Sequence, residues 1–236
     1  MRKNQVLDIF LNMTITKPSK KPIAAFFDLD LTLSAKDSFR YFLKTQYLYD
    51  YQNWHLTPLV FLYGILRKIR IISLQTFKEK ALMSLIGETS SFIKTRGNNF
   101  FEKYLLYSIR SEGIKAVKRH RAKGHYSFIV SASPDIYVKH LSDYLNCNGY
   151  ACSMLAYNND KFIGKFSGKD CIGAEKIERM QSLVQTIGIS LGDSYAYSDN
   201  ESDLPLLEWV GNPVVVNPTA VLQKIAMEKG WKIEQW

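Results

Sequence analysis

The segment Ile23-Ala24-Ala25-Phe26-Phe27-Asp28-Leu29-Asp30-Leu31-Thr32-Leu33 decides the fold of this 236-residue chain. Its first five residues are continuously apolar, which is typical of a strand that is buried on both faces of a parallel sheet. The apolar run ends directly in two acids, Asp28 and Asp30. In open α/β sheets, ligands bind at the carboxyl edge of the strands. The segment therefore predicts an α/β protein with two carboxylates at that edge.

A second segment, Tyr195-Ala196-Tyr197-Ser198-Asp199-Asn200-Glu201-Ser202-Asp203, has the same form, an apolar run followed at once by carboxylates. If both runs are strands of one sheet, Asp28, Asp30 and Asp199 meet at its carboxyl edge. Carboxylates this close raise each other's pKa, and a divalent cation such as Mg²⁺ relieves that conflict. One carboxylate could then attack phosphorus while its neighbour moves protons. The two segments together indicate phosphoryl chemistry.

Further side chains fit this chemistry. A strand predicted from Tyr126 to Val130 ends at Ser131, whose hydroxyl, with the amides that open the next helix, could hold a phosphate oxygen. Lys176, on a predicted helix, is a fixed cation for a phosphate dianion, and Asp203 could steady it. Each signal alone also fits a loop of turn-forming acids, an ordinary helix cap or a solvated lysine. Together, at predicted strand edges and in this order, they favour the functional interpretation.

After residues 1–21, the sequence predicts a strand, then a long helical stretch, and then alternating helices and strands. In the helical stretch, Thr57 is a predicted N-cap with Pro58 at the first helical position, and Ser73 is predicted to cap a helix that stops at Gly87. Later strands are predicted at 126–130, 194–197 and 214–216, with a β-hairpin formed by 150–156 and 161–166. This order predicts a Rossmann-like parallel sheet core with an inserted all-helical cap. The predicted parts are a basic N-terminal extension (1–21), a core (22–36 and 115–236) and a cap (37–114).

Composition and charge restrict the class of protein. Hydrophobic residues make up 46% and charged residues 22% of the chain, as in ordinary globular proteins, and the formal net charge is +9. No recognisable module interleaves basic and aromatic residues, so we expect no nucleic-acid partner. Cys147, Cys152 and Cys171 form no CxxC pair, which favours free thiols in a reducing compartment over a zinc site. The longest uncharged apolar stretch, Leu56 to Leu66, is too short to span a bilayer, and we expect a cytoplasmic protein.

The ordered set of motifs resembles the haloacid dehalogenase superfamily of phosphohydrolases, in the subfamily IB branch that looks like phosphoserine phosphatase. Asp28-Leu29-Asp30-Leu31-Thr32 matches the first motif of that family, and Ile129-Val130-Ser131-Ala132-Ser133 matches the second. The segment from Gly164 to Gly173 leads into the third-motif lysine, Lys176, and the residues from Tyr197 to Leu207 match the fourth. The resemblance covers nearly the whole chain outside the N-terminal extension.

This resemblance implies a role for each matching residue. Asp28 would be the nucleophile that forms an aspartyl phosphate, and Asp30 the general acid and base. Mg²⁺ would bind Asp28, the main-chain carbonyl of Asp30, and Asp199. The residues implied for the phosphate are Ser131, Ala132 and Lys176, and those that support the site are Asp203 and Thr32. Three positions depart from the commonest pattern: Leu31 and Ser198 stand where glycine is frequent, and Asn200 where serine is usual.

The sequence and the resemblance lead us to expect a Mg²⁺-dependent phosphomonoester hydrolase that acts on a small phosphorylated metabolite. Two alternatives stay open: a lipid-phosphate phosphatase, similar to a phosphatidylglycerophosphatase, and a catalytically silent binding protein with this fold. The segment from Leu56 to Ile72 bears on the first, because it is unusually apolar and carries Arg67, Lys68 and Arg70 near its end. We expect its apolar residues to turn inward as the packed face of the cap. The alternative is a surface that leans on a membrane. No feature indicates an oligomeric state.

Overall fold

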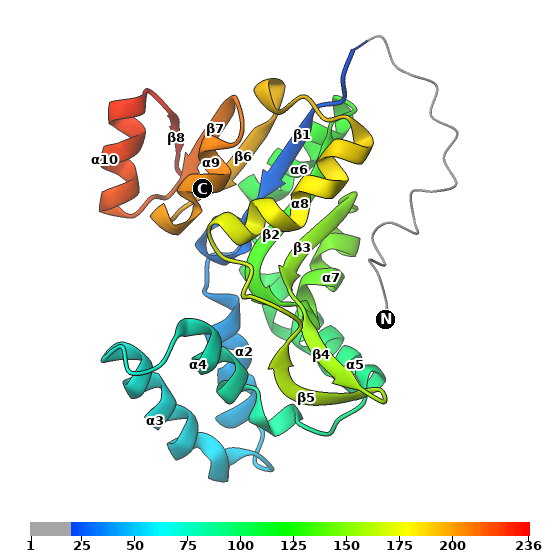
Figure 1. Ribbon diagram of the computed structural model, residues 1–236, viewed down its shortest axis with the longest axis vertical. Helices are drawn as coiled ribbons and strands as arrows, with labels where there is room; N and C mark the ends of the chain where they lie inside the picture. Colours follow the sequence, from blue (N-terminus) through cyan, green and yellow to red (C-terminus); the bar gives the residue numbers. More distant parts are fainter. Residues whose placement is uncertain (1–19) are drawn as a thin grey trace.

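A six-stranded parallel sheet forms the centre of the structure, a computed structural model that describes residues 20–236. Its strand order is β3-β2-β1-β6-β7-β8, and each neighbouring pair is parallel (Figure 1). The strands are β1 (Ala24–Phe27), β2 (Tyr126–Pro134), β3 (Gly149–Ser153), β6 (Tyr195–Ser198), β7 (Asn212–Val216) and β8 (Lys232–Glu234). The predicted Rossmann-like α/β fold is confirmed. The predicted basic extension, residues 1–21, lies outside the described residues except for its last two.

Helices cover both faces of this sheet (Figure 1). Alternate residues of β1 enter two different apolar clusters, because successive side chains of a strand point to opposite faces. Ala25 and Phe27 pack with residues of α6 and α7, whereas Ala24 and Phe26 pack with residues of α8, α9 and α10. Burial on both faces explains why this strand is apolar without alternation. The covering helices are α6 (Ser111–Ala122), α7 (Asp135–Tyr144), α8 (Ala174–Ile187), α9 (Leu204–Glu208) and α10 (Ala220–Lys229).

Between β1 and α6 the chain forms a helical insert beyond the carboxyl ends of the strands (Figure 1). Its helices are α2 (Ser38–Tyr47), α3 (Thr57–Lys68), α4 (Leu74–Ala81) and α5 (Ser90–Phe100), joined by loops and single turns. Ser73 caps α4 as predicted, because its side chain accepts a hydrogen bond from the amide of Thr76, but α4 ends at Ala81 and not at Gly87. The predicted helix start at Thr57 is confirmed, but Thr57 is not its cap: it lies inside the helix and donates its hydroxyl to Tyr47 O at 2.9 Å.

The insert docks on the core through α5 and α4. At Gly97 the backbone of α5 comes so close to α7 that a Cβ atom would collide with the carbonyl of Ile136. Only glycine can stand at this position without moving one helix. From α4, Lys78 reaches the core and forms an ion pair with Asp170, at 2.8 Å between Nζ and Oδ2. The insert is therefore held to the core both by close packing and by a buried ion pair.

Helix α3 departs from the prediction, because only one side of it, which includes Val60, packs against the core cluster, while the apolar residues on its opposite side stay exposed. None of its residues is buried, and Phe61 is 70% exposed. Helix α3 lies at the outer end of the insert, where α4 and the turn Trp54–Leu56 are its main neighbours (Figure 1). The expectation that the Leu56 to Ile72 segment forms the packed face of the cap therefore holds only for the side of α3 that carries Val60, and it is wrong for the opposite side, which is exposed. No helix among residues 20–236 is long and apolar enough to cross a bilayer.

The predicted β-hairpin is correct at its turn and too long in its first arm. Strand β4 (Leu155–Asn158) pairs antiparallel with β5 (Lys161–Phe166). Asn159 and Asp160 form the two-residue loop with positive φ angles of 46° and 62°, as turns of this length favour. Residues 150–153 belong instead to β3, which pairs with β2 in the main sheet, because this part of the run is buried against the core. The hairpin packs beside the insert, where Gly87 N donates to Phe162 O at 2.9 Å.

Candidate active site

The register of the sheet brings the predicted site residues to one edge. Phe27, the last residue of β1, pairs with Ile129 of β2 and with Tyr197 of β6. Strand β1 is also where the strand order changes direction, with β2 on one side and β6 on the other. Ligands of open α/β sheets bind at such a position. The side chains that follow the paired residues therefore gather at this edge: Asp28, Ser131 and Asp199.

Lys176 joins two carboxylates in the interior of the site. Its Nζ donates to Asp28 Oδ1 at 2.7 Å and to Asp203 Oδ2 at 2.6 Å. Ser198 donates its hydroxyl to the same oxygen of Asp203 at 2.7 Å, which gives this departure from the family pattern a local role. Burial opposes the charge of Lys176, but Asp203 and Asp28 outweigh it and raise the pKa of Lys176. Lys176 is thus a fixed cation with one N–H left for a further acceptor.

Thr32 lies between the two carboxylates that are predicted to bind a metal. Its Oγ1 is 3.3 Å from Asp28 Oδ2 and 3.2 Å from Asp199 Oδ1. Burial raises the pKa of Asp199 to about 6, although the hydrogen bond from Thr32 lowers it. Burial also raises the pKa of Asp28; Lys176 lowers it, and the neighbouring carboxylates, led by that of Asp203, raise it again. The site thus holds carboxylates that resist ionisation without a further cation.

A divalent cation fits this set of donors. The buried carboxylates of Asp28, Asp199 and Asp203 face a single ammonium, which leaves an excess of negative charge. Asp203 Oδ1 is buried and has no hydrogen-bond partner in the described part of the chain. Within residues 20–236, no group of three or more His, Cys, Asp or Glu side chains is arranged to hold a metal. The ligands of a bound Mg²⁺ would therefore be two carboxylates together with main-chain and water oxygens, all of which Mg²⁺ accepts.

Asp30 has a separate set of partners. Its Oδ1 accepts a hydrogen bond from Ser38 N at 2.5 Å, and its Oδ2 accepts one from Ser133 Oγ at 2.7 Å. Tyr137 donates its hydroxyl to Ser133 Oγ at 3.1 Å, which fixes the serine in turn. Burial raises the pKa of Asp30, and the charge of Asp37 raises it further against the hydrogen bonds from Ser38 and Ser133. Asp28 and Asp30 are two residues apart, yet only Asp28 contacts the lysine.

The predicted phosphate-binding residues, Ser131 and Ala132, are fixed by hydrogen bonds from neighbouring residues. Ser131 is buried, and its Oγ accepts a hydrogen bond from Ser133 N at 3.0 Å, so the hydroxyl proton remains free to donate. The carbonyl of Ala132 accepts a hydrogen bond from Lys78 Nζ at 2.8 Å, and Ser153 Oγ, whose proton goes to Asp170, lies 3.1 Å from the same oxygen. These bonds fix the peptide that follows Ser131.

Sequence reasoning missed several of these supporting residues. Ser38, Ser133 and Tyr137 surround Asp30, and Lys78 and Asp170 hold the loop after Ser131. Ser133 was inside a quoted motif. Its position directly after Ala132, at the edge of the sheet, could have marked it as a site residue. Asp170 was likewise inside a cited segment, the one from Gly164 to Gly173. Ser38, Lys78 and Tyr137 had no such signal, because serine, lysine and tyrosine in helices are ordinarily read as surface or packing residues.

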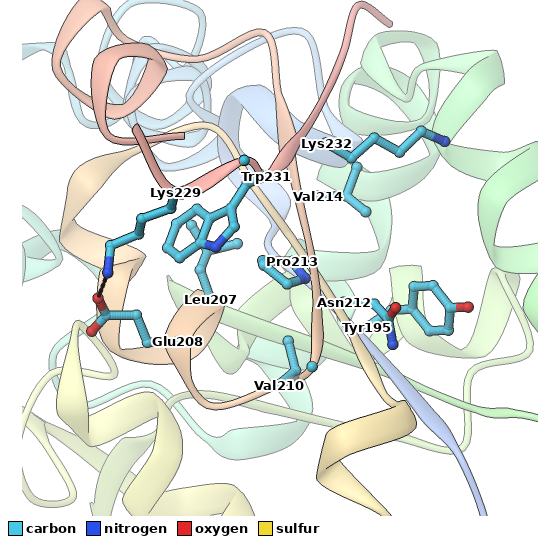
Figure 2. A pocket seen from close by; sticks show the side chains of 12 residues that line it. Tyr195, Leu207, Glu208, Val210, Asn212, Pro213, Val214, Lys229, Trp231 and Lys232 are labelled. Atoms are coloured by element: carbon cyan, nitrogen blue, oxygen red, sulfur yellow. Dashed lines mark ion pairs between the residues drawn. The ribbon is translucent and has the colours of Figure 1, made fainter. Parts of the chain in front are cut away.

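A large hollow elsewhere in the core is not part of this site. It has a volume of about 720 Å³ and is lined by residues that include Tyr195, Asn212 and Trp231. Figure 2 shows Trp231 between Pro213 and the ion pair of Lys229 with Glu208, whose charged atoms are 2.9 Å apart. Tyr195 opens β6 and Asp199 follows its end, so the hollow and the carboxylates are separated by roughly 13 Å of strand.

The model of the haloacid dehalogenase-like hydrolase family matches residues 25–208, which include the strand-edge acids, Ser131 and Lys176. The chain belongs to this family. The expected family, the fold class and the expectation of a phosphatase are confirmed. The match leaves the roles of individual residues as predictions.

Curated relatives align over most of the chain. A phosphoserine phosphatase of Mycobacterium tuberculosis is 26% identical over 221 residues, which cover 90% of this chain and 70% of that protein. A histidinol-phosphatase of Neisseria meningitidis is 27% identical over 230 residues, which cover 89% of this chain and 96% of that protein. Among solved structures, a protein of unknown function from Bordetella pertussis has a TM-score of 0.81 at 22% identity, covering 91% of this chain and 98% of that one. A substrate-bound phosphoserine phosphatase has a TM-score of 0.62 at 16% identity, covering 87% and 90%. The structural likenesses support the fold.

Proposed function

We propose that this chain is a Mg²⁺-dependent phosphomonoester hydrolase that works through an aspartyl phosphate on Asp28, with a small phosphorylated metabolite as its substrate. The observation that carries the proposal is the different surroundings of the two neighbouring acids. Asp28 contacts the ammonium of Lys176, whereas Asp30 is held by an amide and a hydroxyl and forms no ion pair with any residue from 20 to 236. The first arrangement suits a carboxylate nucleophile, and the second suits an acid that holds a proton.

In this mechanism, an oxygen of Asp28 attacks phosphorus and the bond from phosphorus to the ester oxygen breaks. Asp30, whose pKa burial raises, gives its proton to the departing oxygen. Asp30 then takes a proton from water as that water attacks phosphorus, and the bond from phosphorus to Asp28 breaks to release inorganic phosphate. Both acids return to their starting states, so the cycle balances.

The remaining residues would bind charge. Asp28, Asp199 and the main-chain carbonyl of Asp30 would hold Mg²⁺, which when bound offsets their negative charge and that of the phosphate dianion. The free N–H of Lys176 and the hydroxyl of Ser131 would donate to phosphate oxygens, with the amide of Ala132 beside them. Asp203 and Thr32 would keep Lys176 and the carboxylates in place.

The relatives support a small substrate, because one is named for phosphoserine and another for histidinol phosphate. We propose that residues 37–114 act as the cap over residues 22–36 and 115–236, and that free thiols at Cys147, Cys152 and Cys171 reflect a cytoplasmic location. A catalytically silent protein is disfavoured by the full set of acids and the lysine. The exposed face of α3 is the one observation that favours a lipid phosphate as substrate instead.

The proposal is tested by phosphate release from a panel of phosphorylated metabolites and a generic aryl phosphate. Asp28→Asn should abolish turnover together with acid-stable covalent phosphate, whereas Asp30→Asn should slow turnover and keep the nucleophile. Lys176→Ala should lower the rate by roughly two or more orders of magnitude. Chelation should stop the reaction and Mg²⁺ should restore it. Covalent phosphate on the Asp28→Asn protein, or full activity in metal-free buffer, would exclude this mechanism.

A further inference from the structure

The outer face of α3 is apolar where a helix on the surface is normally polar. Helix α3 and its C-cap expose Pro58, Phe61, Ile65 and Ile69, which follow one another at spacings of three and four residues, with Leu62 exposed next to Phe61. Such spacing places side chains on one side of a helix. Here that side points to solvent, since Phe61 is 70% exposed and Ile69 is 58% exposed. Large exposed apolar patches on a protein mark surfaces that bind a partner or a membrane.

Aromatic side chains extend this stripe at its N-terminal end. Trp54, in the turn before α3, is 69% exposed, and Tyr49 and Tyr51 in the preceding loop are also exposed. Beside Trp54 and Phe61 runs an apolar groove of about 530 Å³. Tryptophan and tyrosine combine an apolar ring with a polar group, which is why they collect where hydrocarbon meets water. The stripe and its aromatic end therefore match the border of a bilayer.

The charge around the stripe has one sign. Arg67, Lys68 and Arg70 stand at its C-terminal end, and none of them is in an ion pair within residues 20–236. The sequence contains no Asp or Glu from position 51 to position 78. A two-fold dimer through this face would set the patch against itself and bring these cations together without an acid to pair them. An anionic surface complements them.

We propose that the exposed face of α3 is a docking surface for an anionic lipid bilayer. With 12 residues, α3 is about 18 Å long, which is too short to cross the hydrocarbon layer but suits a helix that lies in the plane of the interface. Phe61, Leu62, Ile65 and Ile69 enter the acyl region, Trp54 lies at the headgroups, and the cations contact lipid phosphates. This inference goes beyond the proposed function, because docking requires no turnover.

The test is co-sedimentation of the full chain with vesicles of phosphatidylcholine alone or mixed equally with phosphatidylglycerol. The unaltered chain should bind the anionic vesicles more tightly, and less so as salt is raised. Replacing Lys68→Gln and Arg70→Gln together should weaken binding about 25-fold, at about five-fold for each cation. Replacing Phe61→Ser and Ile65→Ser together should weaken it at least about ten-fold. All four side chains lie on the surface of the insert, so thermal unfolding should barely change.

The matched control is Lys94→Gln with Lys103→Gln, which removes the same charge from exposed lysines on and after α5 that form no ion pair with the other described residues. Helix α5 packs against α7, away from α3 (Figure 1). This pair should leave binding within about two-fold. Because the first 21 residues also carry five basic side chains, the comparison between the two charge variants decides the question, and equal losses in both would overturn the proposal.

Tryptophan fluorescence locates the contact. Lipids with brominated acyl chains should quench the emission of the vesicle-bound chain, and Trp54→Phe should remove most of that quenching, since the other three tryptophans lie in the core half of the chain. Undiminished quenching in Trp54→Phe would overturn the proposal. So would sedimentation showing a dimer that Phe61→Ser dissolves, because a second copy would then cover this face.

Discussion

Loss of the ammonium of Lys78 should destabilise the whole fold, because it would leave a buried carboxylate unpaired. Lys78 Nζ lies 3.1 Å from Asp170 Oδ1 and 2.8 Å from Asp170 Oδ2, and the two side chains are 7% and 5% exposed. Breaking a buried ion pair by removing one partner costs about 3–5 kcal/mol. Ser153 still donates to Asp170, so we expect Lys78→Met to lower the free energy of unfolding by about 3 kcal/mol, the lower end of that range. For a chain of this length, that lowers the melting temperature by roughly 6–12 °C.

The matched control is the ion pair of Lys139 with Asp143. It is shorter, at 2.6 Å, but its side chains are 46% and 61% exposed. Lys139→Met should therefore lower the free energy of unfolding by at most about 0.5 kcal/mol, since water replaces the lost partner. Burial, and not distance, sets the difference between the two variants.

Urea denaturation of single and double variants measures both effects. In Lys78→Met with Asp170→Asn the buried charge is gone, so the double variant should be more stable than Lys78→Met by about 2 kcal/mol. Two outcomes would refute this reasoning: a fall of less than about 1 kcal/mol in the free energy of unfolding of Lys78→Met, or a double variant no more stable than the single one. Lys78→Met should also raise KM, because the carbonyl of Ala132 loses its tie to α4.

Three further outcomes follow from single side chains. Leu31 has a φ of +59°, so Leu31→Gly should be more stable than Leu31→Ala by about 1 kcal/mol in urea denaturation, the reverse of the usual order. Burial lowers the pKa of His120 from 6.5 to about 4. Between these two pH values His120 is protonated in the unfolded chain and neutral in the folded chain. Stability should therefore fall as the pH drops from 6.5 to 4, and His120→Gln should flatten that slope in denaturation series; an unchanged slope would contradict the assignment. Burial raises the pKa of Asp199 to about 6, so protons should compete with Mg²⁺ and the calorimetric Kd for Mg²⁺ should rise about ten-fold per unit below that pH. A Kd that stays constant from pH 7 to pH 5 would exclude Asp199 as a ligand.

The position of the strand-edge acids was predictable from the sequence because it depends on local order along the chain. A run such as Ile23 to Phe27 is continuously apolar only when a strand is covered on both faces, and the residue after it must then stand at the sheet edge. Parallel pairing of β1 with β2 and β6 brings Asp28, Ser131 and Asp199 together without further information. The helical insert was likewise visible as a long stretch of 3.6-residue spacing.

The partners of those acids were not predictable in the same way, since they come from distant parts of the chain. Ser133 is 103 positions from Asp30, and Asp170 is 92 positions from Lys78. A serine at a strand end or a lysine in a helix has the same neighbours in the sequence whether it meets solvent or a buried carboxylate. Only the packing of α4 and α7 against the strand edge chooses between these cases.

By itself, the sequence determined most of the order of helices and strands, though not β3 and β8 as strands of the main sheet. It also determined the acids, serine and lysine at the edge of the sheet, because apolar periodicity and strand ends are properties of neighbouring residues. The tertiary structure decided which face of each helix is covered. For α3 the spacing of Phe61, Ile65 and Ile69 is the same whether the stripe meets a core or solvent. The pattern records that a face is apolar, and what lies against that face depends on where the rest of the chain packs.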